Sequence, residues 1–190
     1  MIGAKPGIGG TLFFQGDKII KAYGKDAGTI SYKATGGGTV CSGGTAKGNN
    51  FRHDYWIFKN NYANCVKTLC DLKQNGSEVL IAPGVQKFDN GKVIKNERDG
   101  YIIVWGSPLE EYGVIGTALI WKPSAFNGFY EDDDGVFVKL KEKDKPFVEY
   151  LSLAVWNRAS AEIPDSPEKF SKYIENISLK YRNSLSVVLK

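Results

Sequence analysis

Residues 101–121 read YIIVWGSPLEEYGVIGTALIW and contain two apolar runs, Tyr101–Trp105 and Val114–Trp121. Both runs are rich in β-branched and aromatic side chains, and both are of strand length. The segment between them carries the glycine, serine and proline that are typical of turns. The stretch therefore predicts two neighbouring core strands, and it favours a β fold.

Further strand-length segments lie on both sides of this pair. The glycine-rich stretch Thr35–Asn50 predicts a long flexible loop with room for one short strand. Lys87–Arg98 predicts a polar connection with a turn at residues 89–91. Strands are predicted at Thr11–Phe14, Lys18–Tyr23, Thr29–Ala34, Phe51–Phe58, Asn64–Leu72, Glu78–Ala82, Val136–Leu140, Pro146–Trp156 and Leu185–Leu189.

One helix is expected near the C-terminus, at Ser166–Ser178. Ser166 is a typical N-cap residue, and Pro167 suits the first helical position because its missing N–H costs nothing there. Apolar residues then recur at helical spacing. Because about ten strands accompany a single helix, we predict an all-β fold, an antiparallel β-sandwich with one short C-terminal helix. Residues 1–190 are expected to form one domain, which could be part of a longer protein.

Charge and hydropathy argue against two classes of partner. The net charge is +4, and the 25 Lys and Arg are interspersed with 21 Asp and Glu. Proteins that bind nucleic acid usually concentrate positive charge along one surface, so no nucleic-acid partner is expected. No apolar run approaches the roughly 20 residues of a membrane helix, so no membrane partner is expected either. The N-terminal MIGAKPGIGG lacks the apolar core of a signal peptide.

The three cysteines do not indicate a disulfide framework. Cys65 and Cys70 are five residues apart, so on one strand they would point to opposite faces. Since the chain has one histidine and no Cys-x-x-Cys pair, a zinc site is not expected. We interpret Cys41, Cys65 and Cys70 as small core residues.

The segment FRHDYWIF carries the single histidine, His53. Its ordinary pKa near 6.5 makes it the natural proton-transfer group if it lies in a cleft. His53 and Tyr55 would share one face of a strand, while Arg52 and Trp56 would face the other way. The alternative is a structural histidine at a strand edge.

A cluster of acidic residues, Glu131–Asp134, precedes a predicted strand. Carboxylate oxygens on a turn suit Ca²⁺, so Asp132 and Asp134 are candidate metal ligands. The pattern lacks the later glutamate of an EF-hand, and a solvated turn is the alternative. We expect calcium, the one cofactor considered, to add little.

Several aromatic residues fall near predicted loops, where they could stack on sugar rings. Because aromatic residues in strands mostly belong to the core, we expect two or three of them to be accessible. The candidates for ligand binding are Trp56, Trp105, Tyr112, Trp121 and Trp156.

The order of several segments resembles the domain-of-unknown-function family numbered 4861. These segments are PGIGGTLFFQGDKIIKAYGKDAGTISYKATGGG, VLIAPGVQKF, YGVIGTALIWKPSAFNGFYEDDDGVFVKL and YLSLAVWNRA. The resemblance implies a galactose-mutarotase-like supersandwich and an association with bacterial polysaccharide degradation. It also implies that the chain corresponds to the C-terminal half of longer members, so that a site shared between halves would be incomplete. The family supplies no catalytic residues to carry over.

Three functions follow as hypotheses. The first is an enzyme acting on acidic plant or algal polysaccharide, and the second is a non-catalytic carbohydrate-binding domain. The third is a structural interaction domain, with another domain of the same protein as its partner. The resemblance further implies a secreted or periplasmic location.

The enzyme hypothesis has a lyase and a hydrolase form. A lyase needs a cation beside the substrate carboxylate and a proton-abstracting Tyr or His, whereas a hydrolase needs two carboxylates. The catalytic candidates for a lyase are His53, Tyr55, Lys87 and Arg158, with Arg98 and Tyr112 as further available groups. The candidates for a hydrolase are Glu110, Glu111 and Glu131.

Overall fold

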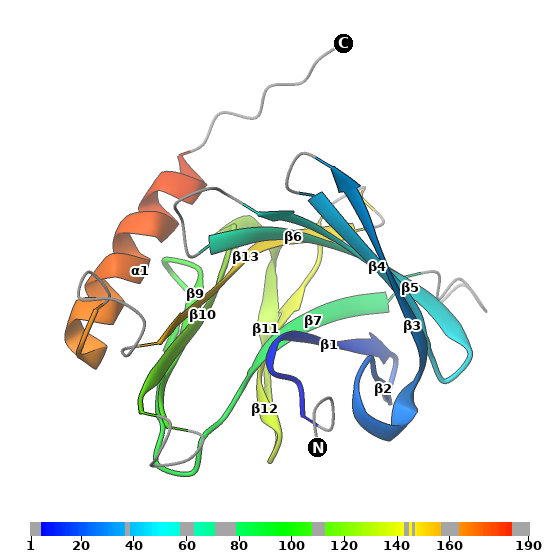
Figure 1. The fold of residues 1–190 in the computed structure, drawn as a ribbon, viewed down its shortest axis with the longest axis horizontal. Helices are drawn as coiled ribbons and strands as arrows, with labels where there is room; N and C mark the ends of the chain where they lie inside the picture. Colours follow the sequence, from blue (N-terminus) through cyan, green and yellow to red (C-terminus); the bar gives the residue numbers. More distant parts are fainter. Residues whose placement is uncertain are drawn as a thin grey trace.

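Two antiparallel sheets and a C-terminal helix form the described part of the chain (Figure 1). The computed structural model describes residues 5–36, 39–57, 63–70, 79–107, 113–142, 145, 147–156 and 164–183. The predicted all-β sandwich is confirmed. The predicted strand at Leu185–Leu189 lies outside the described residues.

The smaller sheet, called sheet A below, has five strands, and the larger, sheet B, has eight. In order, sheet A consists of β11 (Phe126–Glu131), β12 (Gly135–Leu140), β7 (Val79–Gln86), β1 (Ile8–Gln15) and β2 (Lys18–Lys21). Sheet B consists of β3 (Ala27–Gly36), β4 (Thr39–Ala46), β5 (Asn49–Ile57), β6 (Ala63–Cys70), β13 (Phe147–Trp156), β10 (Ile115–Trp121), β9 (Tyr101–Gly106) and β8 (Lys92–Asn96).

Strands β9 and β10 are buried on both faces, which explains their unbroken apolar sequence. Ile102 and Val104 of β9 point into the core between the sheets, together with Trp121 of β10. Ile103 and Trp105 point the other way, into a second core under helix α1 (Pro167–Arg182). A strand covered on one side only would alternate apolar and polar residues instead.

Helix α1 begins where the sequence predicts and continues to Arg182, beyond the expected end at Ser178. The Ser166 side chain accepts a hydrogen bond from the backbone N–H of Lys169, at 3.3 Å, which caps the helix. The helix packs on β9 and β10 and lies away from β3, β4 and β5 (Figure 1). Among the described residues, no helix has the length and apolar character needed to cross a membrane.

The prediction of a flexible loop at Thr35–Asn50 is wrong, because most of this stretch forms β4 and the start of β5. Strand β4 is paired on both sides, with β3 and β5, so its backbone hydrogen bonds compensate for its glycines. The turn into β5 is Lys47-Gly48, and both residues have positive φ, 46° and 78°. This hairpin geometry is usually signalled by Asn-Gly or Asp-Gly.

Two edge strands were also missed. Strand β8 lies within the segment Lys87–Arg98, which was predicted as a polar connection. Strand β11 is interrupted by Gly128, with φ 110°, and its register shifts between Phe126 and Phe129. Edge strands tolerate such irregularity and polarity because one side has no partner strand.

The three cysteines are free and half-buried. Cys65 and Cys70 pack against the two cores, as interpreted, but the interpretation is wrong for Cys41, which lines the pocket on the outer face of β4.

Phe170→Ala is expected to lower the free energy of unfolding by about 3–5 kcal/mol, the usual cost of a cavity left by a buried phenylalanine. The Phe170 ring is fully buried and lies 5.5 Å from the Trp105 ring. Urea denaturation measures the change. Leu179→Ala is the matched control, because Leu179 is exposed on the same helix. Equal losses in the two variants would contradict the packing of α1.

Candidate functional site

A cluster of polar side chains lies in the core between the sheets and includes two of the predicted catalytic residues. His53 and Tyr55 of β5 share a face, as expected, and His53 Nδ1 lies 3.0 Å from the Tyr55 hydroxyl. His53 Nε2 lies 3.4 Å from the Thr11 hydroxyl, on β1 of the opposite sheet. The Thr11 hydroxyl also donates to the Gly9 carbonyl, at 3.0 Å. The cluster therefore connects sheet A to sheet B.

These contacts identify the histidine tautomer. Thr11 has one hydroxyl hydrogen, and Gly9 accepts it, so the Thr11 oxygen must accept from His53 Nε2–H. Nδ1 is then unprotonated and accepts from the Tyr55 hydroxyl. Both ring nitrogens are satisfied when the imidazole is neutral.

The electrostatics of this cluster do not favour proton abstraction. Burial lowers the pKa of His53 to about 4, with a smaller opposing effect from Asp54, and only 7% of the residue is exposed. Burial raises the pKa of Tyr55, and the hydrogen bond with Ser42 offsets part of this rise. At neutral pH the pair is thus a buried neutral imidazole and a protonated phenol that is partly exposed. Its clearest role is to satisfy hydrogen bonds in the core.

The other catalytic candidates are not joined to this pair by the structure. The Lys87 amine forms a 3.2 Å ion pair with Glu131, which Lys95 also contacts, at one edge of sheet A. Arg98 lies exposed in the turn between β8 and β9. Arg158, Tyr112, Glu110 and Glu111 lie outside the described residues. A catalytic role for these groups stays a prediction.

The acidic turn before β12 has a partner within the protein. The Lys21 amine lies 3.4 Å from Asp132 and 2.5 Å from Asp134. Asp132 also accepts hydrogen bonds from the backbone N–H groups of Asp134 and Gly135, at 2.9 and 3.1 Å. Within the described ranges, no group of three or more His, Cys, Asp or Glu is placed to hold a metal ion. A calcium ion would have to displace Lys21.

The tryptophan candidates divide into buried and exposed residues. Trp105 and Trp121 belong to the two cores, whereas Trp56 is 37% and Trp156 44% exposed. Because Val155 packs beneath α1, alternation places Trp156 on the opposite face of sheet B. Trp56 lies on the face that carries α1, but on β5, which the helix does not cover. Tyr112 lies outside the described residues.

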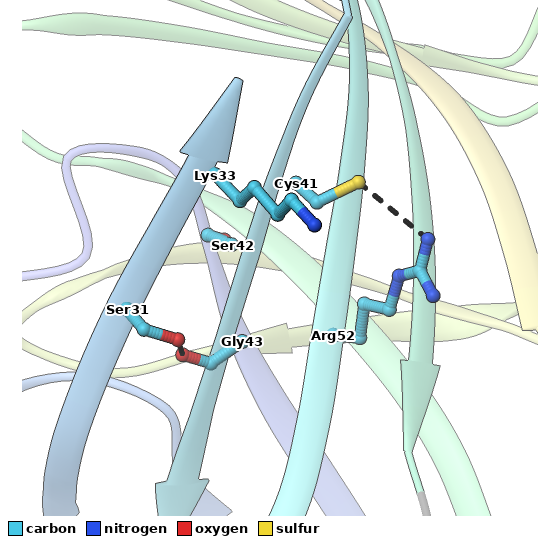
Figure 2. Close-up of a pocket in the computed structure, with 6 residues that line it drawn as sticks. All are labelled: Ser31, Lys33, Cys41, Ser42, Gly43 and Arg52. Carbon is cyan, nitrogen blue, oxygen red and sulfur yellow. Dashed lines mark hydrogen bonds between the residues drawn. The ribbon is translucent and has the colours of Figure 1, made fainter. Parts of the chain in front are cut away.

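The outer face of β3, β4 and β5 carries a shallow pocket of about 340 Å³ (Figure 2). Its volume is at the lower end of the range found for small-ligand sites. The pocket exists because Gly43 has no side chain between Ser31 of β3 and Arg52 of β5, its partners in the sheet. It is lined by Ser31, Lys33, Cys41, Ser42, Gly43 and Arg52.

The polar groups of this pocket are linked in one network. Arg52 Nε donates to Asp54 at 2.6 Å. Arg52 Nη2 lies 3.5 Å from Cys41 Sγ, the contact marked in Figure 2. Burial raises the pKa of Asp54, but the hydrogen bonds from Cys41 and Arg52 and the charge of Lys67 lower it below its ordinary value. Asp54 is therefore a carboxylate that holds Arg52 in place.

The local sequence pattern does not identify these residues as a pocket. Arg52 and Trp56 lie on the face opposite His53, as predicted. The predicted loop at residues 35–50, however, leaves out strand β4, which brings Lys33, Cys41 and Gly43 beside Arg52. A signal was present in the Lys47-Gly48 turn, which closes the β4–β5 hairpin.

The model of a family described as a domain of unknown function, DUF4861, matches residues 2–187. No curated protein matches the chain.

The free energy of unfolding is expected to fall as the pH drops from about 6.5 to about 4, because the unfolded state takes up a proton on His53 before the folded state does. The shift in pKa corresponds to about 3 kcal/mol once both states are protonated. Above about pH 6.5 the imidazole is neutral in both states, and His53 adds no pH dependence. Urea denaturation across this pH range measures the effect.

His53→Gln is the control, because glutamine cannot take up the proton and should flatten this part of the profile. Because the chain has one histidine, the ring-proton resonances of its imidazole can be followed by NMR without overlap from others, with an expected midpoint near 4. Parallel stability profiles for the two proteins, or a midpoint near 6.5, would contradict the buried placement.

Proposed function

We propose that this chain, which belongs to the DUF4861 family of domains of unknown function, is a carbohydrate-binding domain whose ligand is a polysaccharide or its fragments. The observation that carries the proposal is the outer face of β3, β4 and β5, which helix α1 does not cover. This face carries the pocket, and the exposed Trp56 lies further along β5 on the same face.

The surface has the features that a glycan needs. Arg52, Asp54 and Trp56 alternate along the outer face of β5, at intervals of roughly 7 Å. Aromatic rings stack on the apolar faces of sugars, and the polar groups beside them can bind hydroxyls. A shallow, open surface suits a segment of a long polymer better than a small molecule, which is usually enclosed.

An enzyme is the second candidate, because the structure does bring His53 and Tyr55 within 3.0 Å. In this reading the pair would act on a sugar entering between the sheets beside Tyr55, which is partly exposed. The low pKa of His53 and the raised pKa of Tyr55 both weigh against it, because neither group is a ready base at neutral pH.

Location and partners follow from the proposal. Because polysaccharides of plants and algae lie outside the cell that degrades them, we propose that the domain is secreted or periplasmic. Another domain of the same protein is the proposed catalytic partner, and the role of this domain would be to hold the polymer near it.

Trp56→Ala is expected to weaken polysaccharide binding by roughly ten- to a hundredfold, since base–aromatic stacking, a comparable contact, contributes about 1–3 kcal/mol. Affinity electrophoresis in gels containing soluble plant and algal polysaccharides measures the change. Trp156→Ala is the control, because it removes an equally exposed tryptophan from the opposite face. Loss of binding in Trp156→Ala alone would contradict the assigned surface.

Incubation with acidic polysaccharides is expected to give no unsaturated product and no new reducing ends. Absorbance of unsaturated uronates and a reducing-sugar assay follow the two reactions. Turnover that is abolished in Tyr55→Phe but retained in Trp56→Ala would establish the enzyme instead. Tyr55→Phe keeps the ring and removes only the hydroxyl that contacts His53.

A further inference from the structure

We infer that the pocket on β3–β5 is a carboxylate-binding site, in which Lys33 and Arg52 hold the acidic group of a uronic acid residue. This inference rests on the proposed function and names the chemical class of sugar. Lys33 and Arg52 come from β3 and β5, the two strands that flank the strand carrying Cys41 and Gly43 (Figure 2).

Lys33 supplies the first positive charge. It is an exposed residue of β3, the edge strand of sheet B. In the part of the chain that the structure describes, no carboxylate forms an ion pair with Lys33. Its charge is therefore available to a ligand in the pocket.

Arg52 supplies a second positive charge in a fixed orientation. A guanidinium has five N–H donors. Within the described residues, Asp54 accepts from Nε and Cys41 Sγ from Nη2, so three donors remain for a ligand. The remaining edge of a guanidinium fits the two oxygens of a carboxylate, and charge-assisted bonds of this kind are the strong ones.

Asp54 is the positioning residue of this site. It holds the Nε side of Arg52, and its own carboxylate is largely buried, so it is not presented to the ligand. Lys33 and Arg52 together carry two positive charges, and Asp54 compensates one of them. The pocket thus keeps a net positive charge, which favours an anionic group.

The floor of the pocket and the spacing of Arg52 and Trp56 along β5 indicate how a bound polymer would lie. Gly43 forms the floor, and a Cβ built there would lie 3.8 Å from Ser31 Oγ and 3.9 Å from the Phe51 carbonyl oxygen. A methyl group therefore fits without strain, but it would take up ligand space. Trp56 lies four residues beyond Arg52, or roughly 13 Å along β5. A bound oligosaccharide would place its acidic residue at Arg52 and a residue further along its chain, not the adjacent one, on Trp56.

The test uses polygalacturonate and alginate oligosaccharides, each beside its carboxyl-reduced counterpart, in which the acid is converted to an alcohol. Isothermal titration calorimetry should show binding of the acidic forms that weakens with salt, and at least roughly tenfold weaker binding of the reduced forms. Arg52→Gln and Lys33→Gln should remove most of this preference. Lys172→Gln, which removes an exposed positive charge from α1, should retain it.

Gly43→Ala and Lys33→Gln together separate the effect of pocket shape from the effect of charge. Gly43→Ala should weaken acidic and reduced ligands alike, because it fills the pocket and leaves the charges in place. Lys33→Gln tests the charge without disturbing the ion pair of Arg52, so a folding defect in Arg52→Gln would not affect the conclusion.

Each outcome separates this inference from the proposed function. Equal affinity for acidic and reduced forms would overturn the carboxylate site and leave the carbohydrate-binding proposal standing. No binding of any form would overturn both. An acidic preference that survives Lys33→Gln and Arg52→Gln would place the carboxylate elsewhere.

Discussion

The eight-stranded sheet is wider than the layers that cover it, and the rest of the structure follows from this constraint. On its inner face, sheet A buries Val66, Ile102 and Leu119. On its outer face, α1 packs on β9 and β10, and the apolar core beneath it extends to β8, to β13 and to Cys65 of β6. The outer face of β3, β4 and β5 contacts solvent instead, and it carries Lys33, Arg52 and Asp54. The two faces of one strand, β5, therefore differ in chemistry: His53 belongs to the core, and Arg52 to the surface.

The polar cluster around His53 is explained by the cost of burying hydrogen-bonding groups. An unsatisfied polar group in a core costs about 1–3 kcal/mol, whereas a satisfied network can fix the register of the elements that it joins. Thr11 and His53 come from different sheets, and Thr68 contacts Tyr150 at 3.3 Å beside them. Burial also affects function, because a substrate cannot readily reach a neutral histidine inside the core. The residue with the most distinctive chemistry in the sequence is thus better explained by stability than by catalysis.

Local patterns predicted the parts of the fold that depend on neighbouring residues. The apolar runs of β9 and β10, the cap at Ser166 and the shared face of His53 and Tyr55 are all encoded within a few positions. The pocket is not, because Lys33, Gly43 and Arg52 meet only through the register of three strands. Strand β4 was missed because glycine weakens a strand by itself, and its pairing on both sides cannot be read from its own composition. Likewise, no local pattern could show that Trp105 and Trp121 are buried while Trp56 is exposed, since this depends on where α1 and sheet A end.

The central claim is that the ligand surface is the outer face of β3–β5 and not the space between the sheets around His53. Mapping of backbone amide shifts by NMR, during titration with a uronate oligosaccharide, tests it most directly, because it reports on every residue at once and needs no substitution. The account predicts that the largest shifts fall on Ser31, Lys33, Gly43 and Arg52 and continue to the Trp56 indole, with small shifts at Thr11 and Tyr150. Shifts centred on Thr11, His53 and Tyr150, with the outer face unchanged, would contradict it.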